Sequence, residues 1–276
     1  MRGLALLGVA LLASCAPGET RQAAPATGPR IVSLNPCADA VLTEVADEAQ
    51  LLAISDYSHR AGASSMDLSR ARQFRAVSGT AEEVLALRPD VVVAGTFLPP
   101  ATAQAIRGAG IAVVQLPIAE TVDQSREQVV QLARLAGQAA RGKALVAQID
   151  AALERARPPA GAASVSAVVW QSGGIVPGEN TLIVDLLRRT GYVSLAGQKG
   201  MKQADFMPLE KMLVDPPEVI LAAGDSHAEE DRLLSHPALG SLNGTRRARL
   251  DPALLWCGGP TIIRAAQRLA QVRESL

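Results

Sequence analysis

The stretch EEVLALRPDVVVAG at residues 82–95 decides the fold class. Thr80 and Glu83 occupy the positions of a capping box, in which the threonine caps a helix and the glutamate reaches back to it. Proline disfavours a helical conformation in the residue before it, so the helix is predicted over 81–87 and ends ahead of Pro89. The β-branched run VVVAG that closes the stretch is typical of a strand buried on both faces of a parallel sheet.

A similar unit occurs 128 residues later in the chain. Aligning 82–95 with EKMLVDPPEVILAA at 210–223 places Glu82 on Glu210 and brings the prolines and the apolar runs into register. Two interpretations stay open. The alignment reflects either a structural repeat or the ordinary likeness of any helix–proline–strand unit.

Strands and helices alternate on both sides of these two units. Strands are expected at 30–34, 51–54, 112–116, 164–170 and 218–223, and helices at 38–47, 99–109, 181–189, 208–214 and 260–274. Residues 121–156 have a helical pattern that is broken around Gly137 and Gly142 and contain no strand. This order predicts an α/β protein with parallel sheets and a long helix between two halves. The expected bounds are 30–137 for the N-terminal lobe, 138–157 for the helix and 158–276 for the C-terminal lobe.

The first 29 residues have the pattern of an export signal followed by a tether. One positive charge precedes an uncharged run that is too short to cross a bilayer, and the run ends in LASC at 12–15. LASC resembles the bacterial lipobox, which implies a signal peptide at 1–14 and lipidation of Cys15; the alternative is an ordinary signal peptide. Residues 15–29 are rich in Ala, Pro and Gly, which favours a flexible tether. We expect an exported protein whose only membrane contact is the lipid, facing the periplasm.

Composition excludes several classes of function. Basic and acidic residues number 27 each, and this zero net charge gives no electrostatic footprint for nucleic acid. An apolar fraction of 48% is too high for a disordered chain. Three His and three Cys leave little room for a metal site rich in these residues. No GxGxxG string follows the first strand and no Walker A string occurs, so no intrinsic cofactor is expected.

Six stretches resemble one known family. They are RIVSLNPCADAVLTEVAD, LLAISDYS, EEVLALRPDVVVAG, PGENTLIVDLLRRTG, PLEKMLVDPPEVILA and GPTIIRAAQRLA, and they extend from residue 30 to 271. They are similar to the class III periplasmic substrate-binding proteins of ABC importers for iron chelates, haem and vitamin B12, most of all to the vitamin B12-binding members. The resemblance implies two Rossmann-like lobes joined by one rigid helix, a monomer, and a ligand cleft between the lobes. The bound ligand would be a corrinoid or an iron chelate. A Trp that the family has before 81–87 is absent.

Aromatic residues make up only 3% of the chain, so the position of each Trp and Tyr is informative. Ligands of parallel sheets bind beyond the carboxyl ends of the strands. Tyr57 follows a predicted strand, Trp170 ends one, and Trp256 follows Leu254 and Leu255 near the end of the next-to-last element. A flat apolar chelate needs such surfaces. The alternative is that these side chains fill the core. Asn35 and Cys37 lie in the first strand–helix loop, where the family contacts its ligand.

Cys37 and Cys257 fall in loops expected to face the cleft, one in each lobe. Three states are compatible with the sequence: buried thiols, an interlobe disulfide, or contact with a metal in the ligand. A disulfide is chemically allowed in an oxidising compartment. It would restrain a cleft that must open to release its ligand.

Glu82 and Glu210 are expected to dock the protein on its membrane partner. The resemblance implies that one carboxylate on each lobe meets arginines of the permease in an ABC permease and ATPase complex, and such pairs set orientation and association rate. Alternatively, both residues merely favour the helix dipole, as acidic residues in a first turn do.

Three other readings remain from the residues alone. His59 lies close to Tyr57 and is either a ligand of haem iron or an exposed side chain. GDSH at 224–227 has the look of a hydrolase nucleophile turn with Ser226, but it lacks the usual downstream partners. A zinc- or manganese-binding transport protein would need several cleft His and acidic ligands, and His227 and His236 lie in a charged surface segment.

Overall fold

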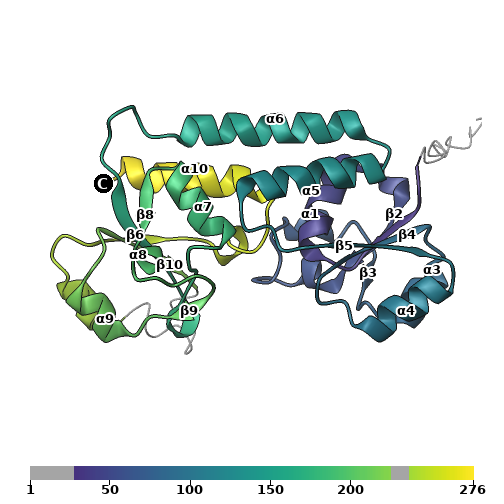
Figure 1. The fold of residues 1–276 in the computed structure, drawn as a ribbon, viewed down its shortest axis with the longest axis horizontal. Helices are drawn as coiled ribbons and strands as arrows, with labels where there is room; N and C mark the ends of the chain where they lie inside the picture. The colour runs from purple at the N-terminus through teal and green to yellow at the C-terminus, as the bar shows by residue number, and fades with distance from the viewer. Residues whose placement is uncertain (1–27, 225–235) are drawn as a thin grey trace, which may run out of the picture.

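The computed structural model describes residues 28–224 and 236–276 and shows two α/β lobes side by side (Figure 1). We call the part built on the first sheet the N-terminal lobe and the part built on the second sheet the C-terminal lobe. Helix α6 (Ala139–Ala156) has 18 residues, about 27 Å of helix, and packs against α5 (Val122–Leu135) and α10 (Thr261–Glu274). It therefore spans both lobes.

The sheet of the N-terminal lobe has five parallel strands in the order β3-β2-β1-β4-β5. In chain order they are β1 (Ile31–Ser33), β2 (Leu51–Ser55), β3 (Ala76–Val77), β4 (Val91–Gly95) and β5 (Ala112–Leu116). The β4 residues Val91–Ala94 are buried, as their apolar sequence predicts.

The sheet of the C-terminal lobe has four parallel strands in the order β11-β10-β6-β8. They are β6 (Val165–Gln171), β8 (Tyr192–Ser194), β10 (Val219–Ala223) and β11 (Arg246–Arg249). An antiparallel pair, β7 (Ile175–Val176) and β9 (Asp205–Phe206), adjoins it. The order β8-β6-β10-β11 repeats β2-β1-β4-β5, and α9–β10 repeats α3–β4 at the offset of 128 residues that the sequence alignment gives.

The helices pack on the faces of the two sheets and enclose three apolar cores. Besides α5, α6 and α10 they are α1 (Pro36–Val45), α2 (Leu68–Ala71), α3 (Ala81–Leu87), α4 (Pro100–Gly108), α7 (Leu182–Arg189), α8 (Leu195–Gln198) and α9 (Leu209–Val214). One continuous core runs through both lobes on the side of α1, α5, α6, α7 and α10. Smaller cores lie on the other faces of the sheets, near α3 and α4 in one lobe and near α8 and α9 in the other.

The predicted fold class is confirmed: parallel α/β lobes are joined by a long helix. Strands β3, β7, β8, β9 and β11 were not predicted. Strand β11 is RRAR, a charged edge strand without the apolar pattern of a buried one. None of the helices within 28–224 and 236–276 is long and apolar enough to cross a membrane.

Candidate functional site

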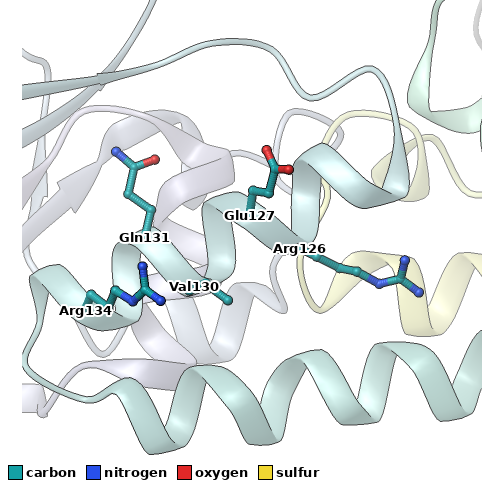
Figure 2. Close-up of a pocket in the computed structure, with 5 residues that line it drawn as sticks. All are labelled: Arg126, Glu127, Val130, Gln131 and Arg134. Carbon is teal, nitrogen blue, oxygen red and sulfur yellow. The ribbon is translucent and has the colours of Figure 1, made fainter.

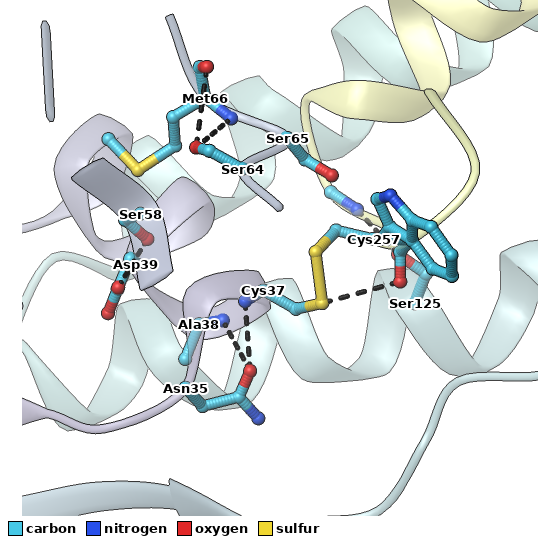
Figure 3. The surroundings of a disulfide bond; sticks show 12 residues. Asn35, Cys37, Ala38, Asp39, Ser58, Ser64, Ser65, Met66, Ser125 and Cys257 are labelled. Carbon is cyan, nitrogen blue, oxygen red and sulfur yellow. Dashed lines mark hydrogen bonds between the residues drawn. A yellow bond between two sulfur atoms is a disulfide. The ribbon is translucent and has the colours of Figure 1, made fainter. Parts of the chain in front are cut away.

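The carboxyl ends of strands from the two sheets meet between the lobes. Cys37 lies in the first turn of α1, directly after β1, and Cys257 lies between β11 and α10. A disulfide joins them, with 4.9 Å between the Cα atoms (Figure 3). Of the three states considered for these cysteines, the structure shows the disulfide. Its sulfurs are not free thiolates, so the expectation of metal contact through them is corrected.

Asn35 caps α1 rather than simply lining a loop. Its side-chain oxygen accepts hydrogen bonds from the backbone N–H groups of Cys37 and Ala38, at 2.9 and 3.4 Å. Pro36 follows at the first helical position, where its fixed φ suits the helix start. The oxygen of Asn35 is thus committed to the cap, and its amide NH₂ remains as the group that could donate to a ligand.

Tyr57 is presented by the 3₁₀ turn η2 (Asp56–His59), which directly follows β2. Its side chain is 52% exposed, and the guanidinium of Arg60 lies 4.5 Å from the ring centroid. The Ser55 hydroxyl accepts the backbone N–H of Tyr57 at 3.3 Å. The strand end therefore holds the backbone of Tyr57 while one ring face interacts with a cation.

Asp39 lies fully buried beneath this turn. Its Oδ2 accepts the backbone N–H of Ser55 at 3.0 Å and the hydroxyl of Ser58 at 2.7 Å. Its Oδ1 has no partner among the described residues. Burial raises the pKa of Asp39 to about 7, against the opposing effect of the hydrogen bonds from Ser58 and Ser55. Asp39 ties α1 to the turn that carries Tyr57, and the sequence reading missed it.

The two tryptophans have opposite environments. Trp256 is 54% exposed, in the segment between η6 (Pro252–Leu254) and α10. Trp170 is 0% exposed, so the expectation that it contacts a ligand is wrong. Strand β6 continues to Gln171, and alternation along it points Trp170 to the same face as Val168, into the core near α8 and α9.

Four further apolar side chains are exposed near strand ends. Phe97 follows β4 and Ile118 follows β5 in the N-terminal lobe. Ile175 and Phe206 belong to the β7–β9 pair, which follows β6. The first two had a usable signal, because each stands two residues after a predicted strand. The other two did not, since two-residue strands leave no pattern.

Glu82 and Glu210 occupy the same position of their helices, the second residue of α3 and of α9. Both are exposed, and neither forms an ion pair within the described part of the chain. Figure 1 shows α3 and α9 on the side of the sheets opposite α6. The carboxylate of Glu83 does not reach back to Thr80 as the capping-box pattern predicts. It accepts the backbone N–H and the hydroxyl of Ser78 instead, both at 2.7 Å.

The remaining candidates do not form a site. His59 is half-buried and its Nε2 is enclosed without a described partner, while His236 Nδ1 accepts the Ala238 N–H at 3.2 Å. Cys15, Ser226 and His227 lie outside the described residues. Over 28–224 and 236–276, no group of three or more His, Cys, Asp or Glu side chains could hold a metal ion.

A shallow depression of about 410 Å³ lies on the surface of α5 and not between the lobes (Figure 2). Its lining residues are Arg126, Glu127, Val130, Gln131 and Arg134. All of them come from one exposed helix face beside α6, so the depression is a gap between side-chain stems. It has no converging polar groups of the kind that fix a ligand.

Comparison with known proteins places the chain in a family. A profile of the family "Periplasmic binding protein" matches residues 31–250. A curated "Cobalamin-binding protein" of Halobacterium salinarum is 26% identical over 206 residues. That match covers 71% of this chain and 54% of the relative, so the chain spans about half the length of that protein.

Solved structures share the fold. The periplasmic heme-binding protein RhuT of Roseiflexus sp. RS-1, in apo form, superposes with a TM-score of 0.73 at 22% identity, covering 88% of this chain and 97% of RhuT. The periplasmic vitamin B12-binding protein BtuF of Vibrio cholerae superposes with a TM-score of 0.69 at 17% identity, covering 90% and 97%. Together with the profile that spans most of both sheets, these matches show that the chain belongs to the periplasmic binding protein family.

Proposed function

We propose that the chain is the substrate-binding protein of an ABC importer and captures a metal chelate, with a corrinoid such as vitamin B12 favoured and haem or a ferric siderophore next. One observation carries the proposal. Large apolar side chains stand exposed in both lobes. Tyr57, Phe97 and Ile118 follow strands of the first sheet, Ile175 and Phe206 belong to the β7–β9 pair, and Trp256 follows η6. Burying such side chains against a flat macrocycle is favourable, whereas leaving them in water serves no packing role.

The choice of ligand class rests on the relatives. The Halobacterium salinarum protein is named as cobalamin-binding, and the similar folds are named as heme- and vitamin B12-binding. Asn35 and the backbone around Cys37 lie beside the disulfide and Trp256, so they are candidates for polar contacts that orient the chelate.

Delivery follows through the two acidic helix starts. Glu82 of the N-terminal lobe and Glu210 of the C-terminal lobe would each meet arginines of the permease in a permease and ATPase complex. Their equivalent positions and their exposure support this role. The binding protein would act as a monomer.

We further propose that residues 1–14 are an export signal, that Cys15 carries a lipid, and that 15–29 form a tether. The lobes would extend over 30–137 and 158–276, joined by 138–157. The LASC string supports the lipid.

Titration of the purified protein with cyanocobalamin, haemin and a ferric siderophore tests the proposal. A chelate bound between the lobes should quench the tryptophan fluorescence of the protein, which makes quenching a measure of binding. Trp256→Ala should weaken binding of the active ligand by about 10-fold or more, as loss of a central aromatic contact does. Val214→Ala, an equally apolar exposed side chain at the end of α9, is the matched control and should bind normally. No binding of any of the three chelates would contradict the proposal.

A further inference from the structure

The disulfide gives the two lobes a second covalent connection. Cys37 belongs to the N-terminal lobe and Cys257 to the C-terminal lobe, and they are separated by 220 residues. The first connection, α6, contacts the other end of α1, where Arg141 donates to the carbonyl oxygens of Val45 and Ala46 at 3.3 and 3.1 Å. Helix α1 is thus held by α6 at its last turn and by the disulfide at its first.

The segment after Cys257 is pressed against the N-terminal lobe. The backbone N–H of Gly259 donates to the Ser125 hydroxyl of α5 at 2.7 Å. A Cβ added at Gly259 would lie 2.6 Å from Val41 of α1, and the residue has a φ of +60°. Arg264, one turn into α10, donates to the carbonyl oxygen of Ser65. No side chain fits at Gly259, so the approach of the two lobes at this point is close.

Trp256 stands immediately before this fixed segment. Its carbonyl oxygen lies 3.4 Å from Sγ of Cys37, while more than half of its side chain is exposed. The backbone of Trp256 is therefore held on the N-terminal lobe, and its indole is left free for a partner. Holding an aromatic group in place before binding lowers the entropy lost when a ligand stacks on it.

We propose that the Cys37–Cys257 disulfide is a positioning tether that holds Trp256 of the C-terminal lobe beside the first turn of α1, so that reduction of this bond frees Trp256 and weakens ligand binding. A dithiol is the reductant. One of its thiolates attacks a sulfur of the bond, its second thiol resolves the mixed disulfide, and two electrons and two protons convert Cys37 and Cys257 to thiols while the reductant becomes a disulfide. The effect on binding rests on the proposed function, but the tether itself does not.

A measurement without ligand tests the tether. The chain has two tryptophans, so protein labelled with 5-fluorotryptophan gives two ¹⁹F resonances, assigned with Trp256→Phe. Dithiothreitol should shift and narrow the Trp256 resonance and leave that of buried Trp170 unchanged. The variant Cys37→Ser/Cys257→Ser should show the reduced spectrum with or without dithiothreitol. An unchanged Trp256 resonance, or equal changes in both resonances, would overturn the proposal, because the bond would then be inert or a global stabiliser.

A second measurement tests the consequence for binding. The Cys37→Ser/Cys257→Ser variant should bind the active chelate about 5- to 10-fold more weakly than the oxidised protein, because the loop must then be ordered on binding. When Trp256→Ala is already present, adding Cys37→Ser/Cys257→Ser should weaken chelate binding little further, since the tether acts through Trp256. Additive losses would overturn the positioning role. If none of cyanocobalamin, haemin and the ferric siderophore binds to any form, the proposed function fails, and the ¹⁹F result still decides the tether.

Discussion

The two lobes place an aspartate at the same point of equivalent helices but surround its charge differently. In the sequence, helix α1 connects the paired strands β1 and β2, and α7 occurs in the connection between the paired strands β6 and β8. Asp39 is the fourth residue of α1 and Asp185 is the fourth of α7, and both are buried. Asp39 faces hydroxyl and N–H groups, whereas Asp185 accepts from Arg188 and Arg189 at 3.4 and 2.9 Å.

The aspartate at the fourth helix position therefore has a different role in each lobe. In the C-terminal lobe, Asp185 also accepts the backbone N–H of Val122 at 2.9 Å, so a paired charge holds α5 against α7. In the N-terminal lobe, Asp39 has no cationic partner in the described structure and lies under the turn of Tyr57. The repeat of the fold therefore extends to the aspartate, but the partners differ: Asp185 faces two guanidiniums, whereas Asp39 faces none and its raised pKa lies near neutral pH.

Substitution of Asp39 should give the largest effect. The unfolded chain ionises this carboxyl near its ordinary value of 3.8 and the folded chain near a pKa of about 7, so between these values the folded state binds more protons. Stability from this group therefore falls as the pH rises from about 4 to about 7, by on the order of 4 kcal/mol. Asp39→Asn lacks this loss. Urea unfolding at several pH values should show the variant gaining on the wild type as pH rises.

The matched control is Glu44→Gln, which removes a carboxyl from the exposed face of the same helix. Its stability should still fall as the pH rises from about 4 to about 7, because Asp39 is retained in this variant. A difference between Asp39→Asn and the wild type that stays constant from pH 4 to pH 8 would contradict the role assigned to burial.

Asp185→Asn should act in the opposite direction at pH 8. An asparagine still accepts the N–H of Val122 but removes one of the two carboxylates that each guanidinium contacts, since Arg188 also pairs with Glu179 and Arg189 with Asp123. We therefore expect a loss of about 1 kcal/mol. The same unfolding experiment measures it. If the two asparagine variants changed stability with the same sign at pH 8, the distinction between the two lobes would fail.

Charge reversal at the helix starts should have the smallest effect. Glu82→Lys and Glu210→Lys should each slow association with the reconstituted permease by up to about 10-fold, since exposed interfacial charges act on the association rate. Ligand affinity should not change. Surface plasmon resonance at low and high salt measures the rate, with Glu44→Lys as the control for net charge. A loss confined to one lobe would show that α3 and α9 are not functionally equivalent.

The regular part of the fold could be predicted because burial dictates it. Val91–Gly95 is apolar on both faces, and the helix over 81–87 has its cap in the sequence, so both were predicted with their observed bounds. Arg246–Arg249 was not predicted, because an edge strand takes charged residues that look like a loop.

The site was less predictable, because its residues depend on distant contacts. Tyr57 directly follows β2, which is a local signal, and it proved exposed; Trp256 is also exposed but follows the turn η6. Trp170 has the same local signal, but strand β6 runs one residue further and turns the indole inward. Asp39 was not singled out from the sequence, since its role depends on its contacts with Ser55 and Ser58.

The separation of the two cysteines also orders the assembly of the molecule. During synthesis Cys37 emerges 220 residues before Cys257, so its thiol has no partner in the described fold until the last helix is about to form. The bond can close only after the described strands of both sheets have been synthesised, because β11 ends at Arg249 and Cys257 follows it. A non-reducing gel, on which the bonded chain differs in mobility from the reduced one, would therefore count the molecules in which the two lobes have met.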